Sequence, residues 1–381
     1  MTGLTGNTDP RFQGLADIVE RQLESGYDLG ASLAVAVDGE VVTDCWGGWA
    51  DEARTRPWEA DTITNVWSTT KTMTALSALM CIDRGLVDPH EKVATYWPEF
   101  GVNGKADIEV RHLMSHTSGV SSWAAPFGVE DLFDDERATA HLAAQEPWWE
   151  PGTASGYHAL NYGHLIGEVI RRVDGRGLKE FFAEEVAGPL GADFTIGCPT
   201  SEHGRIAPVI PPPPVELPAS DAVTDLDSVA MKTFMTPGAG AETANTDGWR
   251  AATIGGANGH GNARSVATIQ AAVSNGGVAS GVKLLSPATI ERIFEPQSDG
   301  PDLAIGLPVR FGIGYALANP ADMLGIASGR CCFWGGWGGS IVLNDLDNRI
   351  TLAYVMNRMQ AGILGNETSA ALLAEYRSIV A

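Results

Sequence analysis

Hydrophobic residues near the start of the chain recur at helical spacing, and two runs of strand-forming residues follow. Between Pro10 and Gly26, apolar residues three or four positions apart predict an amphipathic helix. Ala31–Val37 and Val41–Trp49 flank Asp38-Gly39, a pair that favours a tight hairpin turn. This part of the chain therefore predicts a helix and then two antiparallel strands.

A largely apolar run extends from Ser68 to Gly85. Its composition predicts a helix that is buried on most sides. Gly85 suits the end of such a helix. Ser68 lies at the N-terminal end, where free backbone amides and the helix dipole favour negative charge.

The middle of the chain is helical and rich in loops. Val209–Pro218 contains four consecutive prolines and cannot form regular helix or central sheet, so we expect an extended surface segment that acts as a wall or lid of a cleft. The segments predicted as helices are Glu109–His116, Asp135–Gln145, Tyr162–Val173 and Leu178–Val186.

Strand patterns return near the end of the chain. After a helix at Arg264–Ser274, the sequence predicts strands at Phe311–Ala318, Ser340–Leu343 and Ile350–Met356, and then a last helix at Thr368–Val380. Antiparallel strands from both ends could form one sheet with the helical middle inserted between them. We therefore expect an α/β fold of the α+β type. Its parts are a discontinuous sheet domain (residues 1–100 and 250–381) and a mainly helical domain (101–249), although one composite domain is also compatible with this length.

Charge and composition limit the kinds of partner and the compartment that we expect for this chain. The 381 residues carry 25 basic and 47 acidic side chains, a net charge of −22, which disfavours nucleic acid and anionic lipid as partners. No stretch is long and apolar enough to span a bilayer, and the N-terminus lacks the features of a signal peptide. The five cysteines, including adjacent Cys331 and Cys332, are then most simply reduced thiols, so we expect a cytoplasmic protein.

Ser68 and Lys71 are the first candidate catalytic residues. On a helix, residues three apart share a face. A buried lysine can lose its proton and then accept the proton of a serine hydroxyl, which makes that serine a nucleophile. The same Ser-x-x-Lys pattern recurs at Ser280–Lys283, but glycines and a β-branched residue there predict a loop and short strand, where residues three apart point to opposite faces. Taken alone, Ser68 could equally be a helix N-cap.

Two more segments could complete a site. Tyr157 follows a Pro-Gly turn and precedes a predicted helix, so a loop could present it to a cleft as a second proton carrier. A tyrosine close to a lysine cation can become partly phenolate and act as a base. Phe333–Ser340 is rich in glycine, which lets backbone amides approach a ligand closely, although such a run can also be a plain strand entry.

These motifs occur in an order that resembles the serine β-lactamase/penicillin-binding-protein-like superfamily. Within it, the chain is most similar to esterases related to class C β-lactamases, the family VIII carboxylesterases. The similarity spans most of the chain, from about residue 12 to residue 360. The motifs that carry it are Ser68-x-x-Lys71, Leu113–Gly119, Pro151-Gly152 leading to Tyr157, Gly188–Gly191, Trp334-Gly335-Gly336 and Asn357–Met359.

The resemblance implies a role for each residue of this site. Ser68 corresponds to the acyl-forming nucleophile, Lys71 to the lysine that shares its proton, and Tyr157 to the general base. The amides of Ser68 and Trp337 would form the oxyanion hole. Trp334, Gly335 and Gly336 stand at the substrate-binding edge strand, where β-lactamases carry Lys-Thr-Gly, and His116 lies in a segment that is structural in this family.

The chain departs from the β-lactamase pattern at two positions. Ala159 replaces an expected asparagine, and Trp334 replaces an expected lysine. Both changes weaken the case for β-lactamase activity and leave acyl transfer intact. We therefore expect a β-lactamase-like fold and a serine carboxylesterase that hydrolyses small, short-chain neutral esters through a Ser68 acyl-enzyme, with no cofactor and no metal.

Other functions remain to be weighed. The chain has no Gly-x-Ser-x-Gly pentapeptide, and no glutamate lies between His112 and His116, so neither an α/β-hydrolase nucleophile nor a His-Glu-x-x-His zinc site is supported. A D-aminopeptidase, amide hydrolase, acyltransferase or weak β-lactamase could use Ser68 in the same way. A non-enzymatic binding protein on a decayed enzyme fold is disfavoured by the intact catalytic set. The sequence leaves the oligomeric state open.

Overall fold

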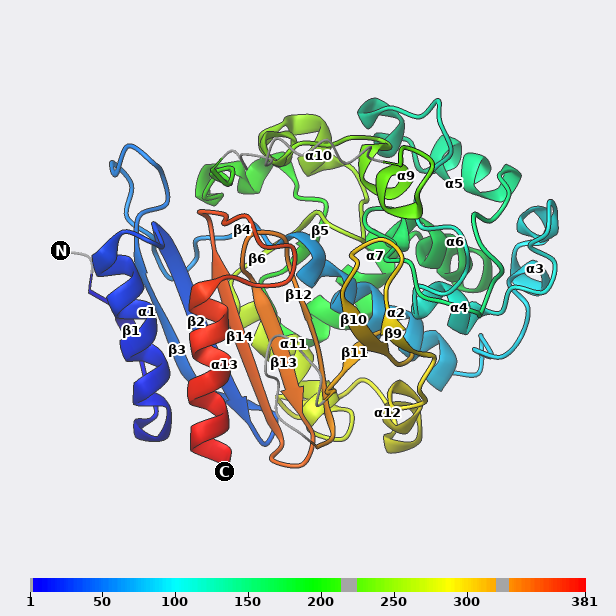
Figure 1. Ribbon diagram of the computed structural model, residues 1–381. Coiled ribbons are helices and arrows are strands. Elements are labelled where there is room, and N and C mark those ends of the chain that lie inside the picture. Colours follow the sequence, from blue (N-terminus) through cyan, green and yellow to red (C-terminus); the bar gives the residue numbers. More distant parts are fainter. Residues whose placement is uncertain (1–2, 214–224, 320–328) are drawn as a thin grey trace.

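A nine-stranded antiparallel sheet is the largest element of the computed structural model, which describes residues 3–213, 225–319 and 329–381 (Figure 1). The strand order is β1-β3-β2-β14-β13-β12-β11-β10-β9. The strands are β1 (Thr5–Asn7), β2 (Gly30–Val37), β3 (Glu40–Gly48), β9 (Ser298–Pro301), β10 (Pro308–Phe311), β11 (Ala316–Leu317), β12 (Cys331–Gly335), β13 (Ile341–Asp345) and β14 (Ile350–Met356).

The two ends of the chain meet inside this sheet. β2 and β3 form the predicted hairpin, and β2 also pairs with β14 along its whole length, from Val37 opposite Ile350 to Ala31 opposite Met356. Strands from near the N-terminus therefore sit next to strands from near the C-terminus, as the sequence predicts.

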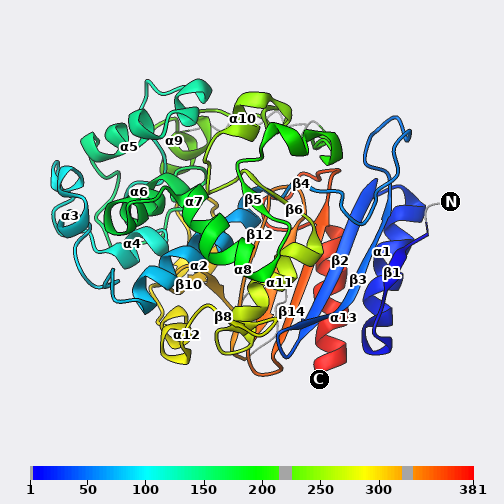
Figure 2. The ribbon, with the colours of Figure 1, turned by 180° about the vertical axis from the view of Figure 1, so that it is seen from behind.

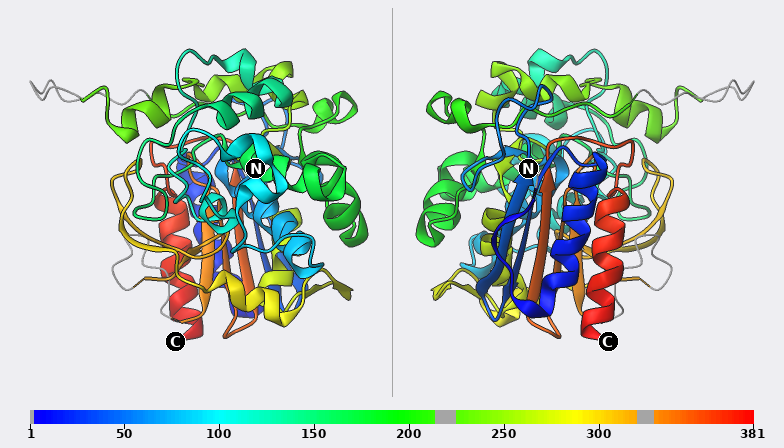
Figure 3. Two further views of the ribbon diagram at one scale, coloured as in Figure 1. Left: turned by 90° about the vertical axis from the view of Figure 1, so that its right-hand side faces the viewer. Right: turned by 90° about the vertical axis from the view of Figure 1, so that its left-hand side faces the viewer.

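Helices cover both faces of the sheet. α1 (Gln13–Ser25) and α13 (Glu367–Val380) pack side by side on one face (Figure 3), and α11 (Ala263–Ser274) packs against β2, β13 and β14 on the other (Figure 2). α1 is a helix because its apolar residues lie on one side, which it buries against the sheet. The predicted helices at both ends and at Arg264–Ser274 are confirmed.

α2 (Thr70–Asp83) is the buried helix that follows Ser68. All its residues from Thr70 to Ile82 are buried, as the sequence predicts. It lies between α6 (Tyr162–Asp174) and α7 (Leu178–Phe182) on the helical side and α11 and β12 on the sheet side. Because it is fixed on all sides, its N-terminus can hold reactive groups in a constant position.

The middle of the chain forms the helical side. All four helices predicted there are present, although the last ends at Phe182 and continues as a π-helical turn, Ala183–Ala187. The domain division at residues 100 and 250 stays a prediction. Two of the four predicted helices are α4 (Val110–Met114) and α5 (Asp135–Ala144). The other α-helices of the described residues, not yet named, are α3 (Val93–Tyr96), α8 (Gly188–Leu190), α9 (Val229–Met235), α10 (Asp247–Ala251) and α12 (Pro287–Ile293).

The structure corrects the sequence prediction at Phe311–Ala318. This segment is not one strand: β10 ends at Phe311 and β11 begins at Ala316. Gly312 lies against the backbone carbonyl of Ile293, where a side chain would not fit, and Gly314 has a φ of +88°. These two glycines turn the chain between the strands.

Some strands of two to four residues escaped prediction because such short runs carry no usable pattern. Of these, β1 and β9 extend the large sheet. A second sheet has the order β4-β6-β5, and β7 and β8 form a separate hairpin, whose second strand is the short strand predicted at Ser280–Lys283. The bounds are β4 (Thr64–Asn65), β5 (Thr195–Ile196), β6 (Gly259–Gly261), β7 (Val278–Ala279) and β8 (Val282–Lys283).

The proline-rich segment is extended where it is described. Ile210 forms a parallel bridge with Arg358, so the segment joins the end of β14. Residues 214–218 of the predicted wall lie outside the described residues. In the described ranges, no helix combines the length and apolar character that crossing a membrane requires.

Candidate active site

Ser68 lies where a short strand turns into a buried helix. After β4, a 3₁₀ turn (Trp67–Thr69) leads into α2. Trp67 has a φ of +49°, an uncommon conformation for a bulky residue, and is held there by contacts with the rings of Trp249 and Trp337. The turn leaves Ser68 partly exposed while Trp67 and Thr69 are buried. The hydroxyl of Ser68 can therefore be reached from outside.

Lys71 lies one helical turn further on and points at Ser68. Its Nζ donates to Ser68 Oγ at 3.0 Å, to the carbonyl oxygen of Ala159 at 2.8 Å and to that of Gly256 at 2.7 Å. Its side chain is buried, and no carboxylate among the described residues pairs with it. Burial therefore lowers the pKa of Lys71 well below its usual value.

The surroundings of Lys71 suit both of its protonation states. Three acceptors match the three protons of an ammonium group. Burial without a counter-charge favours the neutral amine. A group balanced in this way can take a proton from Ser68 and return it.

Tyr157 is the second side chain that contacts Ser68 Oγ. Its hydroxyl donates to Ser68 Oγ at 2.6 Å, and the Nζ of Lys71 lies 4.6 Å from the centre of its ring. Tyr157 is buried, and burial raises the pKa of its phenol above the ordinary value. This direction is opposite to the expectation that a nearby lysine draws Tyr157 towards phenolate, so the structure favours a neutral phenol at neutral pH.

Trp334 packs behind Tyr157 and does not line an open cleft. It is only 2% exposed, its ring lies 5.1 Å from that of Tyr157, and its Nε1–H donates to the Tyr157 hydroxyl oxygen at 3.2 Å. In β12, Trp334 and Gly335 pair with β13, while β11 pairs only with the two preceding residues. The indole N–H that a substrate could have used is thus already engaged.

The glycine-rich loop after β12 carries the predicted oxyanion-hole amide. Within the described ranges, the backbone N–H groups of Ser68 and Trp337 donate to no other protein group. Trp337 is partly exposed and packs edge-on against Trp67, with ring centres 5.0 Å apart. Neighbouring Gly338 is fixed by a hydrogen bond from its N–H to the carbonyl of Gly362. The role of these two amides stays a prediction.

The histidines lie behind the site and do not contact Ser68. His116 and His158 are buried, with their Nδ1 atoms 2.9 Å apart, and His158 Nε2 lies 2.7 Å from Ser118 Oγ. Burial lowers the pKa of both rings, that of His158 to about 3, so both are neutral. His112 accepts the backbone N–H of Glu109 through Nδ1.

Several groups at the site carry no motif and escaped the sequence analysis. The carbonyl groups of Ala159 and Gly256 are backbone atoms, which any residue supplies. Ser340 Oγ bonds Thr69 and the carbonyl of Val66, tying β13 to the Ser68 turn, and Asp302 Oδ1 accepts the backbone N–H of Tyr157. A buried aspartate in a turn has no sequence signal that separates it from an exposed one.

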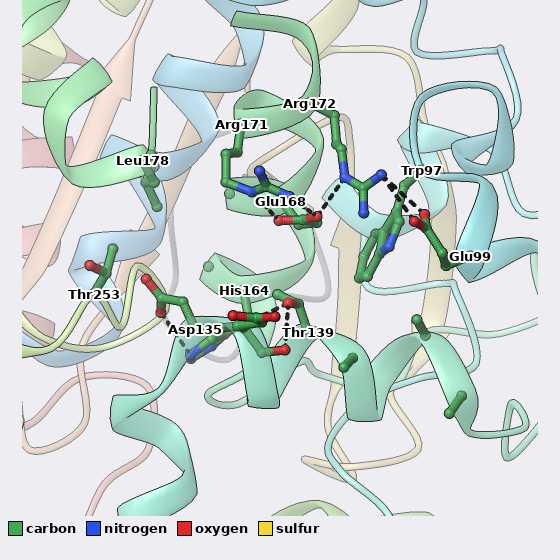
Figure 4. A pocket seen from close by; sticks show the side chains of 17 residues that line it. Trp97, Glu99, Asp135, Thr139, His164, Glu168, Arg171, Arg172, Leu178 and Thr253 are labelled. Atoms are coloured by element: carbon green, nitrogen blue, oxygen red, sulfur yellow. Dashed lines mark hydrogen bonds and ion pairs between the residues drawn. The ribbon is translucent and has the colours of Figure 1, made fainter. Parts of the chain in front are cut away.

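A cavity of about 760 Å³ lies away from these residues, between α5 and α6 (Figure 4). Its charged side chains mostly satisfy one another: Glu168 accepts hydrogen bonds from Arg171 and Arg172, and Arg172 also pairs with Glu99. None of the catalytic candidates lines it. The candidate active site therefore lies at the N-terminal end of α2, apart from this cavity.

The chain is similar to known proteins over most of its length. The family model described as Beta-lactamase matches residues 15–375. The chain is 34% identical over 365 residues to the esterase/beta-lactamase LipL of Mycobacterium tuberculosis, covering 93% of this chain and 83% of that protein. The crystal structure of a family VIII carboxylesterase is 37% identical with a TM-score of 0.91, covering 99% of both chains. A penicillin-binding protein homologue from Caulobacter crescentus is 34% identical with a TM-score of 0.90, covering 98% of this chain and 99% of that one.

Proposed function

The chain belongs to the beta-lactamase family, and from this premise we propose that it is a serine carboxylesterase that works through an acyl-enzyme on Ser68. One observation carries the proposal: Ser68 is partly exposed, and its Oγ lies 3.0 Å from Lys71 Nζ and 2.6 Å from the Tyr157 hydroxyl. A nucleophile with two proton carriers in hydrogen-bond contact is the arrangement that acyl transfer needs.

The proton path follows from the two pKa directions. Neutral Lys71 accepts the proton of Ser68 as Oγ attacks the ester carbonyl. The amides of Ser68 and Trp337 stabilise the oxyanion that forms. When the C–O bond breaks, neutral Tyr157 donates its proton to the leaving alkoxide and regains one from the Lys71 ammonium. Water then attacks the acyl-enzyme by the same steps in reverse and releases the acid.

The site favours uncharged substrates. Trp334 occupies the position where the family's β-lactamases place a lysine cation, and its only polar hydrogen already bonds Tyr157. The net charge of −22 opposes the approach of an anionic β-lactam. Trp337 offers a partly exposed apolar ring to a small acyl or alcohol group. We therefore expect small, short-chain neutral esters to be the preferred substrates.

The chain offers an internal control for the test of this proposal. An organophosphonate should add its mass to the peptide that contains Ser68 and not to the peptide that contains Ser280, the serine of the second Ser-x-x-Lys tetrad. Hydrolysis of p-nitrophenyl esters of increasing chain length, measured with β-lactams and D-amino-acid amides alongside, then gives the substrate class. Labelling at another residue, loss of activity in EDTA, or faster turnover of amides than of esters would overturn the proposal.

A further inference from the structure

Asp302 is a buried carboxylate that braces Tyr157 from behind. It follows β9 and is 1% exposed. Its Oδ1 accepts three backbone N–H groups, from Tyr157 at 3.0 Å, Ala304 at 2.9 Å and Ile305 at 3.0 Å. The N–H of Leu303 also donates to the carbonyl of Ser155 at 2.8 Å. The turn that contains Asp302 is therefore clamped to the segment that carries Tyr157.

The second oxygen of Asp302 makes no such bonds. Oδ2 is buried, and no donor among the described residues reaches it. No lysine, arginine or histidine in the same ranges forms an ion pair with Asp302. Leaving a buried polar atom without a partner is costly for a fold. The hydrogen bonds that Oδ1 accepts must offset this cost.

We propose that Asp302 is the positioning residue of Tyr157: its Oδ1 fixes the tyrosine backbone and so holds the phenol where it reaches Ser68 Oγ. A protonated phenol can donate to the leaving alkoxide, whereas a phenolate cannot. Asp302 touches neither substrate nor Ser68, so it acts through Tyr157 alone. The inference rests on the acyl transfer proposed for Ser68.

The test removes the acceptor oxygen. In Asp302→Ala, we expect kcat to fall roughly tenfold with little change in KM, because the donor is displaced and not the substrate. Asp302→Asn keeps an acceptor oxygen at this place and should recover most of the lost kcat. The matched control is Asp83→Ala. Asp83 also accepts several hydrogen bonds, but it lies at the far end of α2, so its variant should keep the kcat of the unsubstituted enzyme.

A double-mutant cycle separates a role through Tyr157 from a general structural role. In the Tyr157→Phe background, Asp302→Ala should cost almost nothing further, because the group it acts on has already been removed. An equal loss in both backgrounds, or an unchanged kcat in Asp302→Ala, would overturn the proposal. If Asp302→Ala does not fold, Asp302→Leu, which fills more of the space but accepts no hydrogen bond, serves for the same measurements.

The rate of phosphonate labelling of Ser68 distinguishes this inference from the proposed function. Labelling reports the activation of Ser68 without any ester substrate. If the unsubstituted enzyme is not labelled at Ser68, the proposed function fails. If it is labelled but the Asp302→Ala variant is labelled at the same rate, only the role of Asp302 fails.

Discussion

Two segments of this molecule carry the same Ser-x-x-Lys tetrad, and the structure gives them opposite surroundings. Ser68 and Lys71 lie at the start of a buried helix, with Nζ 3.0 Å from Oγ. Ser280 and Lys283 lie in the turn and second strand of the β7–β8 hairpin, both exposed, with Ser280 at a φ of +45°. No hydrogen bond joins the second pair among the described residues.

The difference shows that reactivity comes from the surroundings of the tetrad. A helix places residues three apart on one face, whereas a hairpin does not. Burial lowers the pKa of Lys71, while Lys283 is open to water. Tyr157 and the carbonyls of Ala159 and Gly256 complete the first site. The tetrad is therefore a useful motif only where a buried helix contains it.

The most direct test of the difference between the two tetrads is to remove each serine. Ser68→Ala should lower kcat for p-nitrophenyl acetate by roughly three orders of magnitude or more, because the nucleophile of an acyl-transfer unit supplies most of the rate. Ser280→Ala should leave kcat within about twofold, as expected for an exposed turn residue. Circular dichroism checks that both variants fold. Equal losses in the two variants would contradict the comparison.

Removing the proton carriers tests whether the surroundings act as one unit. Lys71→Ala and Tyr157→Phe should each lower kcat by roughly 10²–10⁴-fold, because both contact Ser68 Oγ. The double variant should be only slightly worse than the worse single variant. Lys283→Ala is the matched control and should leave kcat unchanged. Losses that multiply would show that Lys71 and Tyr157 do not share a proton path.

Trp334→Lys changes the surroundings of Ser68 without touching the tetrad. A charged hydrogen bond contributes about 1.5–3 kcal/mol, against about 0.5–1.5 kcal/mol for a neutral one. We therefore expect kcat/KM for nitrocefin, relative to p-nitrophenyl acetate, to rise roughly tenfold. Part of that change should come from slower ester hydrolysis, since Tyr157 loses the indole N–H. Trp334→Met lacks the cation and should show the slower hydrolysis without the gain on nitrocefin. An unchanged ratio in Trp334→Lys would place the anion contact elsewhere.

The smallest expected effect is on thermal stability against pH. The pKa of Lys71 is lower in the folded protein than its ordinary value of 10.5. Between these two values the unfolded chain binds the proton and the folded one does not, so this group makes stability rise with pH. Lys71→Met should remove that rise. Its change in Tm across this pH window should therefore differ by about a few degrees from that of the unsubstituted protein. Lys283→Met should keep the slope of the unsubstituted protein, and a lost slope there would contradict the assignment to Lys71.

The fold was largely predictable because its main elements have strong local patterns. The β2–β3 hairpin has an Asp-Gly turn, and α2 has an apolar run ending near Gly85. The errors lie where local pattern carries no information. Gly312 and Gly314 break the strand predicted at Phe311–Ala318 through contacts with distant backbone.

The site was predictable only in its side-chain motifs. Ser68, Lys71 and Tyr157 were singled out from the sequence, and the structure brings their polar atoms together. Two features depend on tertiary packing and could not be predicted: the burial of Trp334, and the raised pKa of Tyr157 where a lowered one was expected. Asp302 also went unnoticed, because its importance comes from the amide groups that the fold brings to it.

The pairing of β2 with β14 has a consequence for synthesis on the ribosome. β2 is synthesised long before its partner β14, because most of this sequence lies between them. Until β14 is made, one edge of β2 is open, and open edges recruit other strands. The nascent chain must therefore keep the β2–β3 hairpin shielded over that interval, and the central sheet can close only after β14 has been made.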